Sequence, residues 1–225
     1  MGRIDVAAFK AASKLPLVMV LDNVRSLHNV GSVLRTADAF RLEGVWLCGI
    51  TGAPDGRPAV TPADPVAGGV AMRANPNIAE IHKTALGAEE SVAWHYVATT
   101  LEAVAELRAA GFTIVAIEQC KGSIMLNEAR FFPPPPAPRA GEAECMARIE
   151  PSEANPPVQG AEGVRGYAFI MGNEVKGVAQ EVVDAADIVV EIPQYGTKHS
   201  LNVSVTAGIV MWEVLRQALA AGLLA

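Results

Sequence analysis

The sequence predicts an α/β protein built on a parallel sheet, and three observations lead to this class. Short apolar runs of strand length alternate along the chain with segments whose apolar residues recur every three or four positions. Glycine or a polar pair follows most of these segments and marks their ends. Apolar residues make up 51% of the 225 residues, enough for one sizeable core. Strands that alternate with helices usually pair in parallel, because each helix returns the chain to the same edge of the sheet.

The first half of the chain shows this alternation clearly. Residues 1–16 are expected to be a short helical segment, and residues 17–21 (LVMVL) a buried strand that ends at Asp22 and Asn23. Residues 29–40 have apolar side chains at helical spacing, and Gly44 is expected to end that element. The further segments predicted here are a strand at 45–48, a loop over 51–74, a helix over 75–87, a strand at 96–98, a helix over 101–110 and a strand at 113–117.

A segment of different composition then interrupts the pattern. Residues 131–166 are rich in Pro, Glu and Ala and include the run PPPPAPRAGEAE, so we expect an inserted surface segment that is extended or mobile. The alternation resumes with a strand at 167–171, a helix over 177–185, a strand at 188–190 and a long amphipathic helix over 202–219. We find no internal repeat, and the prediction is a single domain over residues 1–225.

Composition excludes several classes of protein. The three cysteines, Cys48, Cys120 and Cys145, are far apart, so a disulfide framework or a zinc site is not expected, and the four histidines have no metal-ligand spacing. No apolar run is long enough for a membrane span and the N-terminus lacks a signal peptide, so we expect a cytoplasmic protein. The net charge of −6 argues against a large nonspecific nucleic-acid surface but leaves room for a small basic cleft.

Three polar clusters lie at predicted strand ends or at the helix starts that follow them: residues 22–37, 171–177 and 192–204. Open α/β sheets bind ligands at this edge. Gly31 allows another backbone or a ligand to approach, and the planar guanidinium of Arg35 suits a phosphate or a carboxylate. Gly172 follows a buried strand, where a ligand can pass close to the backbone.

Each of these residues also has a purely structural interpretation. Asn29 and Ser200 are plausible helix caps, with Gly196 allowing a tight turn before Ser200. Arg35 is placed to form a surface ion pair with Asp38 or Asp22. Neither GxGxxG nor GxxxxGK[ST] occurs, so nicotinamide-binding and P-loop sites lack their main signal.

In combination the clusters are more specific. Asn29-x-Gly31-x3-Arg35-Thr36-Ala37, then Gly172-Asn173-Glu174-x2-Gly177, then Ile192-Pro193 leading to Ser200-Leu201-Asn202-Val203-Ser204 closely resemble, in this order, the three motifs of the SpoU family in the SPOUT superfamily of RNA methyltransferases. The resemblance covers residues 17–219. It implies an α/β-knot fold, in which a parallel sheet flanked by helices ends in a C-terminal trefoil knot, a rare exception to unknotted topology.

The resemblance also implies a cofactor, a substrate and a set of site residues. S-adenosylmethionine would bind in the knot, and a ribose 2′-hydroxyl of tRNA or rRNA would accept the methyl group. The cofactor-binding residues would be Glu118, Met171, Gly172, Asn173, Ile192, Gln194, Ser200 and Leu201. The catalytic residues would be Asn29, Arg35, Glu174, Ser200 and Asn202. The RNA-binding residues would be Arg25, His28, Arg35, Lys176 and Lys198, and no metal is implied.

The implied roles follow from the chemistry of the transfer. Arg35 would lie at the target ribose, where a guanidinium, whose pKa is above about 12, is better suited to binding phosphate and stabilising a developing alkoxide than to acting as a base. Asn29 would orient Arg35 or the ribose, and Glu174 would fix the guanidinium. Ser200 and Asn202 would hold the start of the last helix. His28 and His199 flank the motifs and either contact RNA or have no special task.

Two other functions remain open: a catalytically silent RNA-binding or assembly protein, and a methyltransferase acting on a base nitrogen. The family is generally dimeric, and the helix over 202–219 is a candidate interface, although its apolar residues could instead pack within the monomer. Those residues are Val205, Ile209, Val210, Trp212, Val214 and Leu215. The additional RNA-binding domain that many relatives carry before the catalytic part is not expected, since only about 16 residues precede the first strand.

Overall fold

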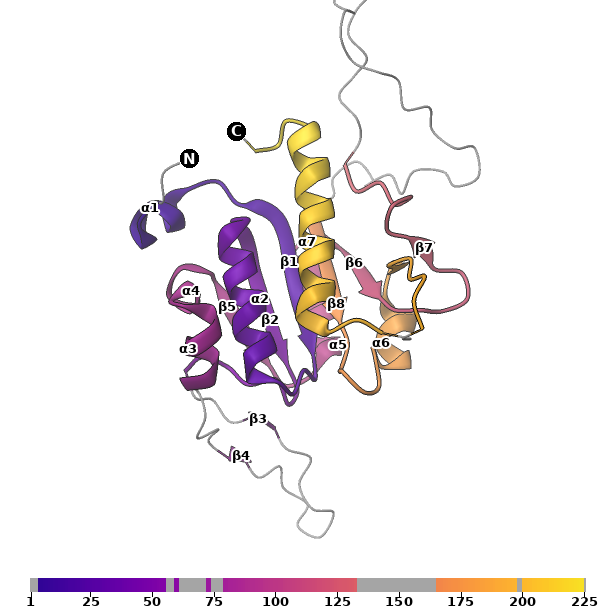
Figure 1. Cartoon of the computed structure of the whole chain (residues 1–225), viewed down its shortest axis with the longest axis horizontal. Coiled ribbons are helices and arrows are strands. Elements are labelled where there is room, and N and C mark those ends of the chain that lie inside the picture. Colours follow the sequence, from indigo (N-terminus) through magenta and orange to yellow (C-terminus); the bar gives the residue numbers. More distant parts are fainter. Residues whose placement is uncertain are drawn as a thin grey trace, which may run out of the picture.

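The computed structural model describes residues 4–55, 59–60, 72–73, 79–132, 165–197 and 200–224. Its main sheet consists of β1 (Leu15–Asp22), β2 (Leu42–Cys48), β5 (Trp94–Val97), β6 (Phe112–Ile117), β7 (Ile124–Met125), β8 (Gly166–Met171) and β9 (Ile188–Glu191). All neighbouring strands of this sheet pair in parallel, in the order β5-β2-β1-β8-β6-β9-β7 (Figure 1). The predicted parallel α/β sheet is confirmed. A separate antiparallel pair joins β3 (Ala59–Val60) and β4 (Met72–Arg73).

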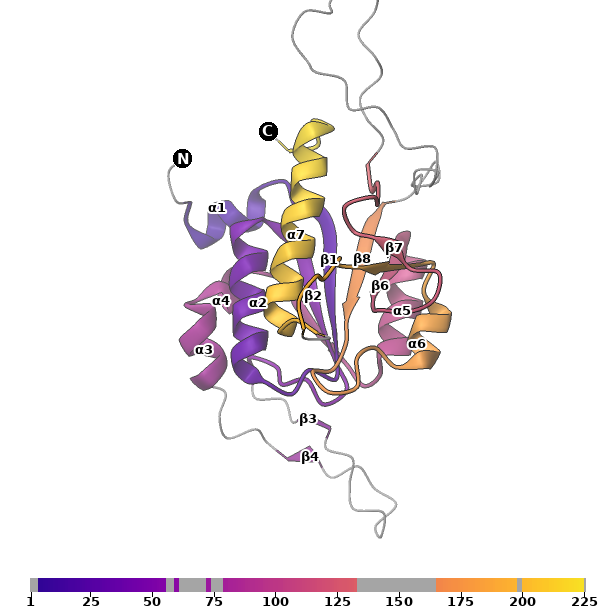
Figure 2. The ribbon, with the colours of Figure 1, turned by 45° about the vertical axis from the view of Figure 1, so that its right-hand side comes forward.

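Helices cover both faces of the sheet. They are α1 (Val6–Ala11), α2 (Leu27–Ala39), α3 (Ala79–Ala85), α4 (Ala88–Ser91), α5 (Thr100–Ala109), α6 (Gln180–Ala185) and α7 (Val203–Ala220). Figures 1 and 2 show α2 and α7 side by side on one face, while α5 and α6 lie on the other. The alternation along β1 explains both layers. Leu17, Met19 and Leu21 belong to the core cluster under α2 and α7, and Val18 and Val20 to the cluster under α5 and α6.

Gly31 sets how closely α2 packs against α3. A Cβ at this position would lie 2.1 Å from Oγ1 of Thr84 and 2.4 Å from the carbonyl oxygen of Ile81, so only glycine fits. The hydroxyl of Thr84 also donates to the carbonyl of His28 at 3.1 Å. The sequence left open whether another backbone or a ligand approaches Gly31. The structure shows that the backbone of α3 does.

The structure corrects two predicted boundaries. Gly44 does not end an element; it lies inside β2, where a Cβ would come within 3.1 Å of the carbonyl oxygen of Ala93. Phe131 is not part of a surface insertion, because its side chain is 1% exposed and packs edge-on against Tyr167 and Phe169. Residues 133–164 of the predicted insertion lie outside the described residues. The trefoil knot stays a prediction.

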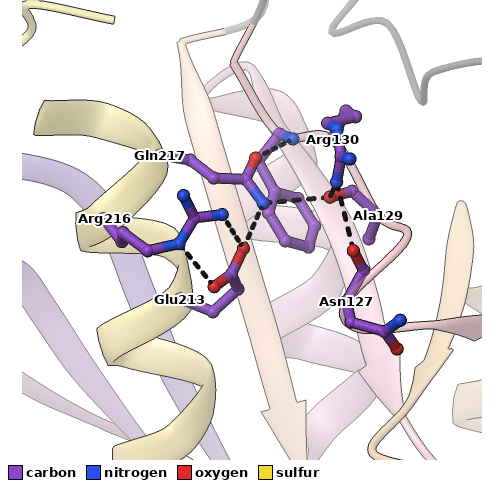
Figure 3. A network of polar contacts seen from close by, with 7 residues as sticks. Asn127, Ala129, Arg130, Glu213, Arg216 and Gln217 are labelled. Atoms are coloured by element: carbon purple, nitrogen blue, oxygen red, sulfur yellow. Dashed lines mark hydrogen bonds and ion pairs between the residues drawn. The ribbon is translucent and has the colours of Figure 1, made fainter. Parts of the chain in front are cut away.

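A network of polar contacts joins α7 to the segment before residue 133 (Figure 3). The buried carboxamide of Gln217 accepts from the backbone N–H of Phe131 at 2.8 Å and donates to the carbonyl of Ala129 at 2.9 Å. Arg216 donates twice to the carboxylate of Glu213, at 2.7 and 2.9 Å, and that carboxylate also accepts from Gln217.

Helix α7 is long and apolar enough to span a membrane. One side of it, however, packs into the core of the protein, and this packing accounts for its apolar residues on that side.

Candidate active site

The three polar clusters of the sequence meet at the carboxyl edge of the sheet. The loop after β8 lies beside the loop after β1, and the side-chain amide of Asn173 donates to the carbonyl of Asn23 at 2.7 Å. The start of α7 reaches the same place, since the carboxamide of Asn202 donates to Oδ1 of Asn29 at 3.2 Å. Segments about 150 residues apart in the chain therefore form one site, as expected where the ends of β1 and β8 are neighbours.

Glu174 holds the loop after β8 against the start of α2. Its carboxylate accepts hydrogen bonds from the backbone N–H groups of Arg25 and Ser26, both at 3.2 Å, and from the side-chain amide of Asn29 at 3.1 Å. Partial burial acts to raise the pKa of Glu174, but hydrogen bonds from its own backbone, Arg25, Asn29 and Ser26 outweigh this and hold the pKa below the usual range. The carboxylate therefore stays ionised and contacts Asn29, not the guanidinium of Arg35 as the resemblance implied.

The amide of Asn29 links this carboxylate to α7. Its Oδ1 accepts from the carboxamide of Asn202 and lies 3.4 Å from the hydroxyl of Ser204. Asn202 in turn is the N-cap of α7, with Oδ1 accepting from the N–H groups of Ser204 at 2.9 Å and Val205 at 3.4 Å. Asn29 thus faces Glu174 and α7, and the structure shows no contact between its side chain and Arg35.

The structure moves both predicted helix caps. Ser26, not Asn29, caps α2, since its hydroxyl accepts from the N–H of Asn29 at 3.3 Å. Asn202, not Ser200, caps α7. In each case another polar residue of the same cluster is the cap, so the side chains of Asn29 and Ser200 are not used for capping.

The loop from 172 to 177 is tightly closed. The backbones of Asn173 and Gly177 bond to each other in both directions, at 3.0 and 2.9 Å, and the Asn173 side chain accepts from Val175 and Lys176. A Cβ on Gly172 would lie 2.2 Å from the backbone of Gly177. The glycine is required at this position because the loop folds back on itself.

Two carboxylates fasten this loop from the sides. Glu118 accepts from the N–H of Val178 at 2.8 Å, on the far side of Gly177. Asp22, only 2% exposed, accepts from the hydroxyl of Thr100, from the amide of Asn23 at 2.7 Å and from the N–H of Ala179 at 3.4 Å. The sequence analysis did not identify Asp22 as buried, although its position as the last residue of an otherwise apolar central strand could have indicated this.

A pocket lies among these loops, with an empty volume of about 670 Å³ that includes space open to solvent. All eight residues predicted to bind the cofactor line it: Glu118, Met171, Gly172, Asn173, Ile192, Gln194, Ser200 and Leu201. The other lining residues are Ile117, Gln119, Glu174, Gly177, Glu191, Val203 and Thr206. Of these, Val203 and Thr206 follow Ser200 and Leu201 into the first turn of α7, and Glu191 ends β9, so adjacency to the motifs could have identified them.

Four of the five predicted RNA-binding side chains are described by the structure, and all four are exposed. Arg25, Arg35 and Lys176 are exposed, and their side chains make no hydrogen bond or ion pair within the part of the chain that the structure describes. Arg35 therefore does not pair with Asp38 or Asp22, which bond to Ser91 and to Thr100 respectively. His28 pairs with Glu80 at 3.2 Å. Lys198 and His199 lie outside the described residues.

Comparison with known proteins agrees with this arrangement. The model of the SpoU rRNA Methylase family matches residues 69–212. The chain is 29% identical over 205 residues to the 23S rRNA (guanosine-2'-O-)-methyltransferase RlmB of Neisseria meningitidis, covering 91% of this chain and 60% of that protein. It is 28% identical over 213 residues to RlmB of Shewanella oneidensis, covering 95% and 64%. The chain thus spans less than two thirds of the length of these curated relatives.

Solved structures show the same fold. The A. aeolicus TrmH/SpoU tRNA modifying enzyme superposes with a TM-score of 0.62 at 24% identity, covering 96% of this chain and 82% of that one. The AdoMet-bound rRNA methyltransferase from Sinorhizobium meliloti superposes with a TM-score of 0.57 at 23% identity, covering 92% and 59%. The family match rests on more than half of this chain, and the pocket lies where its motifs converge.

Proposed function

The chain belongs to the SpoU rRNA Methylase family, and from that membership we propose that it transfers a methyl group from S-adenosylmethionine to a ribose 2′-hydroxyl of RNA. One observation carries the proposal: the eight residues assigned to the cofactor from motif resemblance line one pocket, although they come from four separate parts of the chain. Its relatives named as 23S rRNA methyltransferases favour ribosomal RNA as the substrate. Such a protein would act inside the cell, and we propose the cytoplasm as the compartment.

The lining of the pocket fits the proposed cofactor in charge. Its described lining contains three carboxylates, from Glu118, Glu174 and Glu191, and neither lysine nor arginine. A pocket of this charge favours a cationic ligand such as a sulfonium and disfavours a nucleoside phosphate.

S-adenosylmethionine, when bound, supplies a methyl group on a positively charged sulfur that leaves as a neutral thioether. The protein must therefore place a ribose oxygen in line with that methyl group and accept the charge that develops on the oxygen. Arg35 is exposed and has no described partner, so its guanidinium is free to bind a phosphate next to the target ribose and stabilise the developing alkoxide. The hydroxyl proton would leave to water or to phosphate, because an arginine does not accept it at neutral pH.

The remaining catalytic assignments are positioning roles. Glu174 orients the amide of Asn29, and Asn29 holds Asn202 at the start of α7. Ser200 and Leu201 lie at the pocket wall just before this cap. We propose that these contacts hold the pocket wall in place before the substrate binds, so the wall does not have to reorganise during the reaction. Arg25 and Lys176, and Lys198 and His28 with them, are proposed to bind RNA around this site.

We propose further that the protein is a homodimer through α7. Val205, Ile209 and Trp212 are 51%, 37% and 54% exposed, and with Leu219 they form one stripe along the helix. Val210 and Val214, which the sequence also offered for the interface, are fully buried in the monomer core. Trp212→Glu is therefore expected to give a monomer in light scattering, and a Trp212→Glu variant that stays dimeric would remove α7 from the interface.

The proposed activity is tested in two steps. Calorimetry should show S-adenosylhomocysteine binding at micromolar strength, roughly −8 kcal/mol. Transfer of a labelled methyl group to ribosomal RNA, followed by nucleoside analysis, should then identify a 2′-O-methylated nucleoside. Cofactor binding without transfer to any RNA would favour the silent RNA-binding protein, and a methylated base nitrogen would favour the alternative enzyme. If the folded protein does not bind S-adenosylhomocysteine, with or without RNA, both hypotheses that involve the cofactor, ribose methylation and base methylation, are refuted.

A further inference from the structure

A second recess opens beside the cofactor pocket, on the outer side of the segment that follows β9. It is lined by Gln119, Met125, Asn127, Glu128, Glu191, Ile192, Pro193, Gln194 and Tyr195. Its empty volume is about 760 Å³, including space open to solvent. Gln119, Glu191, Ile192 and Gln194 line both the recess and the cofactor pocket, so the two adjoin each other at these residues. Neither the sequence motifs nor the proposed function assigns a ligand to it.

Tyr195 stands at the rim of this recess with its ring in solvent. Its side chain is 97% exposed, the largest fraction among the large apolar side chains of the described residues. Tyrosine usually covers its ring and leaves only the hydroxyl in water. A fully exposed ring next to a ligand pocket is instead suited to stacking on a planar partner.

The lining of the recess shows which kind of partner fits. Gln119, Asn127 and Gln194 carry side-chain amides, which both donate and accept hydrogen bonds, as the edges of nucleobases do. Glu128 and Glu191 add carboxylates, and the described lining has no lysine or arginine. A phosphate would be repelled by such a lining. A flat apolar protein surface would find few apolar partners, since only Met125, Ile192 and Pro193 accompany the tyrosine.

We propose that this recess receives an unpaired base of the RNA substrate, stacked on Tyr195 and bonded at its edges by the amides, next to the nucleotide that is methylated. The proposal rests on the proposed function and names its substrate class: RNA with an unpaired nucleotide beside the target. A base within a duplex is already stacked on its neighbours and its edge is paired, so it cannot enter. Stacking also provides affinity that does not depend on positive charge, which suits a chain of net charge −6.

The test compares RNA hairpins, whose loops carry each of the four bases in turn, with a fully paired duplex of the same strand length. Fluorescence anisotropy is measured with S-adenosylhomocysteine present. Wild type should bind at least one hairpin more tightly than the duplex. Tyr195→Ala should weaken that binding about 5- to 150-fold, the range expected for one stacked base. Tyr195→Phe, which keeps the ring, should stay within about twofold of wild type. Leu86→Ala, another exposed apolar residue (66%) away from the recess, is the matched control.

Several outcomes would overturn the proposal. They are no preference for any hairpin over the duplex, an unchanged affinity of Tyr195→Ala, and an equal loss with Tyr195→Phe. Loss of S-adenosylhomocysteine binding by Tyr195→Ala would assign the residue to the cofactor, and a change in subunit number would assign it to an interface. The two proposals fail separately. Methyl transfer that does not depend on Tyr195 would refute the role proposed for the recess but not the proposed enzymatic activity. RNA binding that depends on Tyr195, without methyl transfer, would refute the enzymatic activity but not the role of the recess.

Discussion

At the scale of single residues, one carboxylate determines the orientation of two amides. An ionised Glu174 only accepts hydrogen bonds, so Asn29 must turn its Nδ2 toward it and its Oδ1 toward α7. Asn202 must then present its Nδ2 to Asn29, which leaves its own Oδ1 for the backbone N–H groups at the start of α7. The charge of Glu174 is therefore transmitted through two side chains to the cap of a helix that walls the cofactor pocket.

Glu174→Gln is expected to reduce stability by roughly 1 kcal/mol near neutral pH, because the new NH2 group faces N–H donors where the carboxylate accepted. The lowered pKa gives the pH dependence its sign. A carboxyl group with a depressed folded-state pKa stabilises the fold above its usual value of 4.5, and this contribution is lost as the pH falls through the folded-state pKa. Urea denaturation should show the wild-type advantage shrinking below pH 4.5. A difference that stays constant with pH would mean that the charge of Glu174 is not its source.

Arg35→Ala is expected to lower the rate of methyl transfer by about 10²- to 10³-fold, the usual effect of removing one group that stabilises transition-state charge. Affinity for S-adenosylhomocysteine should be unchanged, since Arg35 does not line the pocket. Arg35→Lys should also be slow, because an ammonium lacks the planar fork of a guanidinium. Single-turnover kinetics and calorimetry measure the two effects. Lys83→Ala, an exposed cation on α3, is the control, and normal transfer by Arg35→Ala would refute the role given to Arg35.

At the scale of elements, α7 is fastened at both ends by polar side chains. Asn202 caps its start, and Gln217 near its other end bonds the buried backbone of Ala129 and Phe131. The second anchor joins the last turn of α7 to the backbone of Ala129 and Phe131 (Figure 3), several turns away from the pocket residues Val203 and Thr206. It therefore serves stability rather than chemistry.

Gln217→Leu should destabilise the protein by about 1–3 kcal/mol, because it leaves the buried N–H of Phe131 without a partner, while the carbonyl of Ala129 keeps its hydrogen bond from Arg130 at 3.2 Å. Arg216→Ala, which removes only an exposed ion pair to Glu213, should change stability by less than about 1 kcal/mol. Chemical denaturation compares the two variants. Equal effects would show that the exposed pair, and not the buried amide, carries the anchor.

Most elements were predictable because their apolar periodicity is strong. The runs at 17–21, 113–117 and 167–171 are now β1, β6 and β8 to within two residues, and 202–219 is α7 shifted by one. The two-residue strand β7 was missed, since its pairing with β9 depends on the tertiary fold and not on local sequence. Gly44 misled the prediction because a glycine within a strand, placed to admit the carbonyl of Ala93, looks in the sequence like a glycine that ends the preceding helix.

The grouping of the site residues was predictable, but their pairings were not. The eight residues that the motif resemblance assigned to the cofactor line one pocket, yet the resemblance paired Glu174 with Arg35 instead of Asn29. Hydrogen-bond partners depend on how two loops lie relative to each other in the folded protein, and the sequence of neither loop alone determines this. Tyr195 was missed for a related reason, because the exposure of a loop side chain depends on everything packed around it.

At the scale of the whole molecule, the proposed function requires an acidic protein to bind an acidic polymer. Arg25, Arg35 and Lys176 are the cations around the site whose side chains lack partners within the described residues. The rest of the interaction must come from shape and stacking. A protein of this kind should be selective for RNA structure more than for RNA as such.

The salt dependence of RNA binding tests this directly. Three phosphate contacts predict a slope of log K against log salt of about −2 for single-stranded RNA. Arg25→Ala should remove one phosphate contact and so make the slope shallower by about 0.7, while leaving the fold intact. Anisotropy titrations at several salt concentrations measure both. A steep slope with tight binding to any RNA would instead indicate a larger basic surface than these three side chains provide.

The central place of β1 has a consequence for how the protein is made. β1 pairs with β2 soon after both are synthesised, but its other edge waits for β8, about 150 residues later in the chain. At typical rates of translation the ribosome needs on the order of ten seconds to reach that point. Throughout this interval an apolar strand of the nascent chain offers an open edge to its neighbours. Overproduction is therefore expected to favour inclusion bodies unless chaperones shield this edge, and a chain stalled before residue 166 should be the aggregating species.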